Sequence, residues 1–193
     1  MGIFDALVGR RAVKGPAARE RLFAMSTAYV TLQTEYTIDC GGVAGIVFQP
    51  LATADFEAVV KDMEEVVKAT ASEMGASVDS QDDAYGFRWL IVHDAQAAVE
   101  DLVVTINGVS SAVEDGGYGE RLLCAVFAFK DAKGAKVYFI YNYKRGSWYP
   151  FVPAGGEKQR STERELQLKA QIGGELPIEP ELERWFPLWG IPF

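Results

Sequence analysis

The sequence predicts an α+β fold in which amphipathic helices pack on a largely antiparallel sheet. Short extended segments come in pairs joined by turns rich in Gly and Asp, which is typical of hairpins. Longer segments between the pairs carry apolar residues at three- and four-residue steps, which indicates helices. The 193 residues, 49% of them apolar, can bury one core, so we expect a single domain over residues 1–193. We expect three hairpins, each followed by a helix packed on the sheet, and a secretion-chaperone-like α/β sandwich is the alternative.

The first expected unit covers the extended segments 29–38 and 43–48 and a helix over 53–74. Between the two segments lies Asp39-Cys40-Gly41-Gly42, whose paired glycines allow positive φ and a tight reversal. The helix has the most regular apolar periodicity in the chain, and Gly75 is expected to end it.

The second expected unit pairs 76–82 with 85–93 across a short turn. Asp94 is expected to cap a helix that extends to about residue 115, because apolar residues follow one stripe between them. The paired glycines after this stretch are expected to stop the helix.

The third expected unit has the strongest hairpin pattern, because 121–130 and 135–143 are rich in aromatic and branched residues. A shorter helix is expected over 161–172. Thr162 and Glu165 have the spacing of a capping box at its start.

The C-terminal segment 175–193 is rich in Pro and Trp, so we expect an extended tail draped over the domain. A free tail would leave a large apolar area in water, which is unfavourable. The apolar residues concerned are Leu176, Ile178, Trp185, Phe186, Leu188 and Trp189.

The N-terminal segment 1–15 combines apolar residues that would share one helix face with basic residues after them. We interpret it as a short helix that docks on the domain or on a partner; peripheral membrane contact and a frayed end are the alternatives. The residues concerned are Ile3, Phe4, Leu7, Val8, Arg10 and Arg11.

The net charge of −8 and the pI of about 4.8 argue against non-specific binding of nucleic acid, which requires basic surface. No apolar run approaches the length of a membrane span, and the N-terminus does not have the pattern of a signal peptide. Cys40 and Cys124 do not indicate a disulfide framework. We therefore expect a cytoplasmic protein, with peripheral contact at the inner face of the cytoplasmic membrane left open.

The sequence contains no recognisable catalytic constellation. His93 is the only histidine, and in a strand its neighbour Asp94 would point to the opposite face, so the two would not form an orienting pair. Cys40, Cys124 and His93 lack the ligand spacing of a zinc site, and no loop has the pattern of a phosphate-binding motif. We predict no enzymatic activity, no cofactor and no metal, with a hydrolase using acidic residues as the alternative.

A second candidate site is the segment 141–151, where aromatic residues surround a basic pair at a strand end. Aromatic and Arg side chains are typical of recognition surfaces and cation–π clusters. The alternative is that these aromatics pack under the tail. The predicted partner-binding residues are Tyr143, Lys144, Arg145, Trp148 and Tyr149.

Long strings of the sequence, among them Tyr-Asn-Tyr-Lys-Arg-Gly-Ser-Trp-Tyr-Pro-Phe at 141–151, have a distinctive composition. Others occupy 1–11, 85–92, 118–129 and 174–189. Together they resemble the PspA-associated protein PspAB family of prokaryotes over nearly the whole chain.

The resemblance implies a role beside phage shock protein A, which coats and stabilises the cytoplasmic membrane, and a link to an HtpX-type membrane protease. It supplies no catalytic residue that can be transferred to this chain. We therefore expect a non-enzymatic adaptor or regulator that binds a PspA-type protein. A chaperone-like module that holds a peptide is the alternative, and a homodimer is left open.

Overall fold

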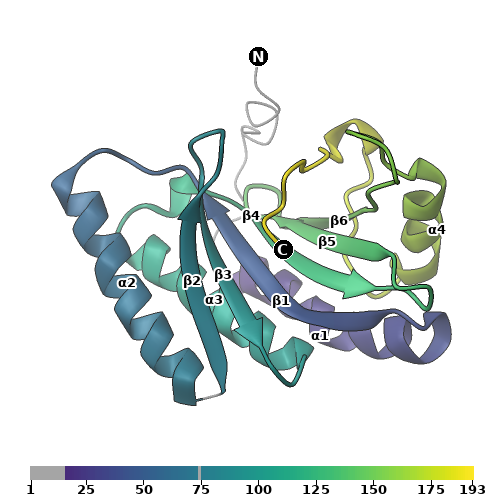
Figure 1. The fold of residues 1–193 in the computed structure, drawn as a ribbon, viewed down its shortest axis with the longest axis horizontal. Coiled ribbons are helices and arrows are strands. Elements are labelled where there is room, and N and C mark those ends of the chain that lie inside the picture. The colour runs from purple at the N-terminus through teal and green to yellow at the C-terminus, as the bar shows by residue number, and fades with distance from the viewer. Residues whose placement is uncertain (1–15, 74) are drawn as a thin grey trace.

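The computed structural model describes residues 16–73 and 75–193, which form an α+β fold with a six-stranded antiparallel sheet (Figure 1). The predicted fold class is confirmed. In chain order the elements are α1 (Pro16–Tyr36), β1 (Asp39–Phe48), α2 (Ala54–Glu73), β2 (Ala76–Asp82), β3 (Arg88–Asp94), α3 (Val99–Asp115), the 3₁₀ turn η1 (Gly119–Arg121), β4 (Leu122–Lys130), β5 (Lys136–Asn142), β6 (Ser147–Phe151), α4 (Thr162–Ile172) and the 3₁₀ turn η2 (Leu182–Arg184).

The strand order is β2-β3-β1-β4-β5-β6, so β1 lies inside the sheet between two strands that follow it in sequence. Ile46 of β1 is opposite Leu90 of β3 on one side and Ala125 of β4 on the other. Both neighbours of β1 are antiparallel to it. The central strand therefore depends on pairings that are distant in sequence.

The first expected hairpin does not form, because residues 29–36 belong to α1. Leu22, Met25, Ala28 and Leu32 recur at three- and four-residue steps and are at most 1% exposed, so burial of this stripe stabilises a helix here. The paired glycines expected to form a turn lie inside β1, where the pairing with β4 shifts register between Cys40 and Ala44. They make an irregular strand rather than a reversal.

One face of the sheet packs against the helices. The larger core cluster joins α1 and α3 to the side chains on that face, and α2 and α4 contribute at its two ends. Figure 1 shows α1 and α3 behind the sheet, with α2 beside β2 and α4 beside β6. Among the described residues, the helices lack the length and hydropathy needed to cross a bilayer.

The other face of the sheet packs against the C-terminal segment, drawn in yellow in front of the strands in Figure 1. Trp185 and Leu188 are each 4% exposed and belong to a second cluster with residues of β1, β3, β4, β5 and β6. Trp189, Ile191 and Phe193 pack against the same cluster and are partly exposed. The strands β1 and β3 to β6 are therefore covered on both faces although helices lie on only one, whereas β2 is mostly exposed.

Two further features differ from expectation. A sixth strand, β6, follows β5 before α4, so the third unit is a three-stranded meander rather than a hairpin. The expected capping box is absent: Ser161 is the N-cap of α4 and makes no side-chain capping bond. The carboxylate of Glu165 has other partners inside the protein.

Candidate interaction site

The aromatic-basic segment is a turn followed by a buried strand. Asn142 Oδ1 accepts hydrogen bonds from the backbone N–H groups of Lys144 at 3.0 Å and Arg145 at 3.3 Å, which fixes the turn. Trp148 and Tyr149 then alternate across β6, and they are 0% and 1% exposed. Trp148 enters the helix-side cluster and Tyr149 enters the tail-side cluster. Both aromatic side chains are thus enclosed by this chain in the conformation described.

Each of these aromatic side chains also makes a hydrogen bond with a distant part of the chain. Trp148 Nε1 donates to the backbone oxygen of Arg21 at 2.7 Å. Tyr149 Oη donates to the backbone oxygen of Phe186 at 3.1 Å. Burial raises the pKa of Tyr149 and of Tyr143, whose hydroxyl is enclosed near α3. These hydroxyls remain protonated at physiological pH.

Arg145 is engaged in an ion pair that attaches the tail to the sheet. Its Nε donates to Glu179 Oε2, and Glu179 is only 2% exposed. Ser147 Oγ donates to the same oxygen at 3.0 Å, and Glu181 lies 4.0 Å from Arg145 on the outer side. Partner binding by this segment stays a prediction, and the accessible groups for it are Lys144 and the partly exposed guanidinium.

A second buried carboxylate was not anticipated from the sequence. Glu165 is 0% exposed and accepts hydrogen bonds from the Val152 N–H at 2.8 Å and from Arg160 Nε at 2.9 and 3.0 Å. Arg160 Nη1 also donates to the Trp185 backbone oxygen at 2.6 Å. The sequence contained one indication that Glu165 is buried, because it lies on the same helix stripe as Leu168, three residues further on. For Glu179 the sequence around it gave no comparable signal.

The residues considered for catalysis are not brought together. His93 is exposed, and its Nε2 lies 3.5 Å from Asp79 Oδ2 on β2. The Asp94 carboxylate accepts hydrogen bonds from the N–H groups of Gln96 at 3.0 Å and Ala98 at 2.8 Å, so it stabilises the loop before α3. The described residues contain no group of three or more His, Cys, Asp or Glu side chains arranged to hold a metal ion.

The two cysteines are free thiols on opposite faces of the sheet. Burial raises the pKa of Cys124 to about 12, and burial also raises that of Cys40. Cys40 lies at the register shift of β1 rather than in a turn. Both thiols are therefore protonated and weakly nucleophilic at neutral pH.

The outer surface of α1 and α3 is notable for the absence of charge along its middle. No Asp, Glu, Lys, Arg or His occurs in 22–34 of α1 or in 102–113 of α3. Phe23 and Val30 on α1 are 38% and 57% exposed, and Val104 on α3 is 46% exposed. We call these residues, with the exposed Thr27 and Gly108, the α1–α3 face.

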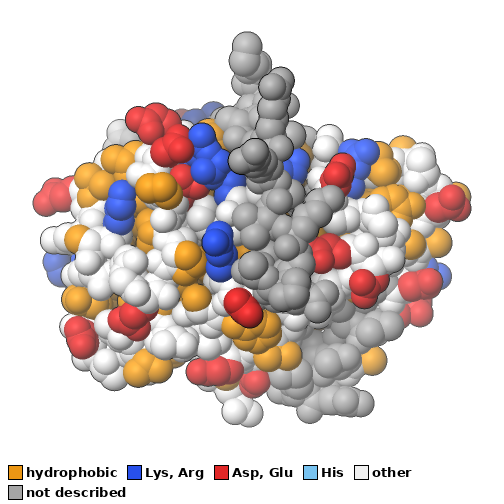
Figure 2. All heavy atoms as spheres, turned by 180° about the vertical axis from the view of Figure 1, so that it is seen from behind, with side chains coloured by type: hydrophobic (Ala, Val, Ile, Leu, Met, Phe, Trp, Pro, Cys, Tyr) orange, Lys and Arg blue, Asp and Glu red, His pale blue; other side chains and the backbone are white. Residues whose placement is uncertain are grey.

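The two helices of the α1–α3 face pack against each other. Figure 2 views the molecule from the helix side, where hydrophobic and uncharged surface separates scattered charged groups. Surface helices usually present charged residues to water, and depletion of charge is typical of the centre of a protein interface. The α1–α3 face therefore has the composition of a contact surface.

The N-terminal candidates lie outside the described residues. These are Ile3, Phe4, Leu7, Val8, Arg10 and Arg11.

The fold and these surfaces define an α+β protein with a sheet covered by helices on one face and by its own tail on the other. The chain belongs to the PspAB family, PspA associated protein B, whose family model matches residues 1–193. No curated protein matches the chain, and no solved structure does.

Proposed function

We propose that this protein is a non-enzymatic adaptor that binds a PspA-type protein in the cytoplasmic response to envelope stress. The observation that carries the proposal is the family match over residues 1–193, because the family is described by its association with PspA. Exposed apolar side chains on an uncharged helix surface supply a physical means of binding.

The α1–α3 face is the surface that we assign to this contact. Val30 and Val104 project from two packed helices whose central stretches carry no charge, so a partner could cover them without desolvating an ionic group. The turn at Lys144 and Arg145 is the second candidate, since basic groups would suit an acidic partner surface.

The test is a binding titration between the full chain and the PspA-type protein of the same genome. We expect association at micromolar concentration. Val30→Asp and Val104→Asp should each weaken it at least about tenfold, because a buried unpaired carboxylate at an interface costs more than about 1.4 kcal/mol. Circular dichroism and thermal unfolding of each variant show that the fold is intact.

The matched control is Leu166→Asp on α4, where an apolar residue is 40% exposed on another helix. This variant should bind as the unmodified chain does. Equal weakening by Leu166→Asp would show that the α1–α3 face is not the contact surface. A folded, unmodified chain that fails to bind at micromolar concentration would contradict the adaptor function itself.

A further inference from the structure

Phe193 occupies a slot on the tail side of the sheet that exists because residue 45 is glycine. A Cβ added to Gly45 would lie 2.8 Å from Phe193 Cε1 and 3.3 Å from Trp89 Cε3. The Phe193 ring meets Trp89 edge to face at a centroid distance of 6.0 Å and Tyr138 at 6.3 Å. Aromatic pairs in this geometry attract each other beyond the effect of burial. The slot is thus shaped for an aromatic ring.

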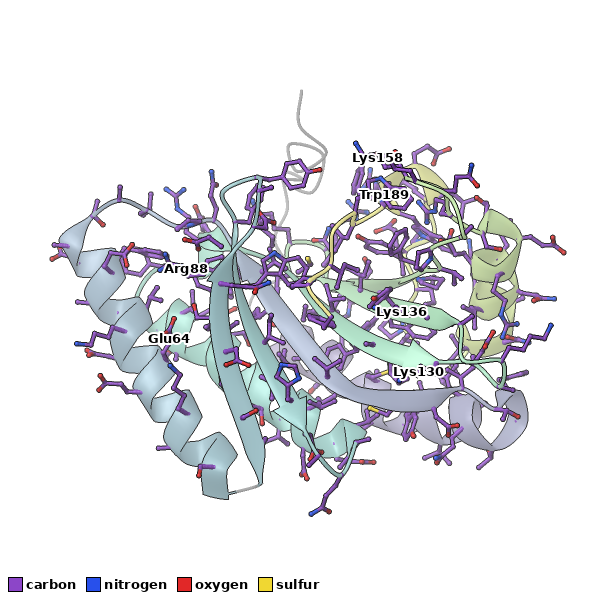
Figure 3. The ribbon with its side chains drawn as sticks, in the orientation of Figure 1. Glu64, Arg88, Lys130, Lys136, Lys158 and Trp189 are labelled. Atoms are coloured by element: carbon purple, nitrogen blue, oxygen red, sulfur yellow. The ribbon has the colours of Figure 1, made fainter. Side chains whose placement is uncertain are left out.

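The same slot has polar donors for the backbone that enters it. Lys136 Nζ and Tyr138 Oη both donate to the Phe193 backbone oxygen, at 3.1 and 2.7 Å. Both donors lie on β5, and Figure 3 labels Lys136 on this strand and Trp189 on the tail, above the strand in this view. The slot therefore recognises two features of one residue together, its aromatic ring and its backbone oxygen.

The tail divides into two parts that are held differently. Residues 176–185 are fastened to β6 by two backbone hydrogen bonds. The Trp148 N–H donates to the Pro177 oxygen at 2.9 Å, and the Glu179 N–H donates to the Trp148 oxygen at 2.7 Å. The buried side chain of Glu179 holds the same part of the tail. We call residues 187–193 the strap. Its end is held by the two side-chain donors of β5, and its aromatic residues Trp189 and Phe193 are only partly buried. The strap is thus held to β5 through side chains, and Leu188, which is 4% exposed, anchors its start in the tail-side cluster.

We propose that the sheet face beneath the strap is a peptide-binding site that the chain fills in cis. Its ligand is an extended apolar segment of a partner protein with an aromatic side chain for the Gly45 slot and a backbone oxygen for Lys136 and Tyr138. The strap itself has this chemistry, and for that reason the same chemistry is assigned to the ligand. Because a tethered segment acts at millimolar effective concentration, a partner segment binds only by displacing it.

The inference goes beyond the proposed adaptor function and is tested without a PspA-type protein. The probe is a fluorescent peptide with the sequence of residues 187–193, titrated into the full chain carrying Trp189→Ala and Phe193→Ala. Fluorescence anisotropy should show binding at least about tenfold tighter than to the unmodified chain, whose strap competes for the site. Leu182→Ala, an exposed position on η2, is the control and should bind the peptide no better than the unmodified chain.

Two further replacements test whether the peptide binds in the Gly45 slot. Adding Gly45→Val to the doubly substituted chain should abolish binding, and replacing the peptide's terminal Phe by Ala should do the same. Unchanged binding after either replacement would overturn the proposal, as would no binding at millimolar peptide. Phe193→Ala alone provides a milder variant. If both strap variants lose cooperative unfolding, the strap is part of the fold and the proposal is wrong.

Discussion

Buried carboxylates set the residue-scale energetics of this protein. Glu165 and Glu179 each accept hydrogen bonds from a guanidinium and from a second group, so neither charge is buried without partners. Each carboxylate also links separate segments of the chain. Glu165 joins α4 to Val152, which directly follows β6, and Glu179 joins the tail to the turn after β5. Charged side chains therefore position α4 next to β6 and the tail on the second face of the sheet.

Glu165→Gln should destabilise the protein by about 1.5–3 kcal/mol, the usual value of hydrogen bonds to a charged group. The amide oxygen can still accept from Val152 and Arg160 Nε, as Oε1 does, but an amide NH₂ in place of Oε2 cannot accept from Arg160 and leaves the guanidinium uncompensated. Urea unfolding followed by circular dichroism measures the change. Glu163→Gln on the exposed side of the same helix should stay within about 0.5 kcal/mol, and a similar loss there would refute the explanation.

Asp82 allows a prediction with a defined pH dependence. Its paired hydrogen bonds from Arg88, at 2.7 and 3.1 Å, lower the pKa of the carboxyl in the folded chain. A lowered folded pKa means that the stabilisation is complete above the unfolded pKa of about 3.9 and is lost as the pH falls through the folded value.

Because the pair is exposed, Asp82→Asn should cost only about 0.2–1 kcal/mol at pH 7. The difference from the unmodified chain should disappear as the pH falls below the folded pKa of Asp82. Chemical denaturation at a series of pH values tests this. A difference that grows toward low pH would show that the pair does not act through the charged carboxylate.

At the scale of elements, the sequence predicts helices with one apolar stripe well and fails where the pattern is ambiguous. The helices expected over 53–74 and 161–172 correspond to α2 and α4 within a residue or two. In α1, apolar and branched residues also occur between the buried positions, so the stretch 29–38 alternates like a strand. Packing against α3, which local sequence cannot reveal, decides for the helix.

The candidate site was predictable only in part, for a related reason. The local sequence of 141–151 identifies aromatic and basic residues but not which of them are covered. Trp148 is enclosed because α1 contributes a backbone acceptor at Arg21, and Tyr149 because the tail contributes one at Phe186. Pro150 lies in β6, the last strand of the sheet, where proline is tolerated. Long-range contacts therefore determine what the segment presents to a partner.

The irregular part of β1 provides an element-scale prediction. Gly42 has φ of 71°, and an added Cβ would lie 2.8 Å from the Asp94 backbone oxygen. Gly134, in the turn between β4 and β5, has φ of 78° but open space around the Cβ position. Gly134→Ala should cost about 1–2 kcal/mol from the backbone conformation alone. Gly42→Ala should cost about 1–3 kcal/mol more, because the overlap adds to that strain.

Thermal unfolding of the two alanine variants separates these contributions. Equal destabilisation would show that the register shift of β1 absorbs the extra carbon, and the proposed close approach to the loop before α3 would then be unimportant. Gly75→Ala, also at positive φ and in open space, serves as a second reference.

At the scale of the whole molecule, a sheet with helices on one face needs another cover for its second face. The tail supplies it through aromatic contacts: Trp185 stacks with Tyr149 at 6.5 Å, and Trp189 meets Phe151 at 5.2 Å. These two contacts lie on either side of the division between the fastened tail and the strap. The second face is thus covered by a part fastened to β6 through backbone hydrogen bonds and by the strap, which is held to β5 through side chains.

Trp185→Ala and Trp189→Ala should therefore differ in their effect on global stability. Trp185 is 4% exposed, donates from Nε1 to the Glu179 backbone oxygen at 2.9 Å and packs under Lys169, so its loss should cost about 3–5 kcal/mol. Trp189 is partly exposed, so its loss should cost less than about 2 kcal/mol. It should raise the hydrogen-exchange rates of backbone amides mainly in β5, beneath the strap. Guanidinium unfolding together with hydrogen exchange measures both effects. A loss at Trp189 as large as that at Trp185 would mean that the tail unfolds as one unit, and a partner segment could then reach the Gly45 slot only by unfolding the protein.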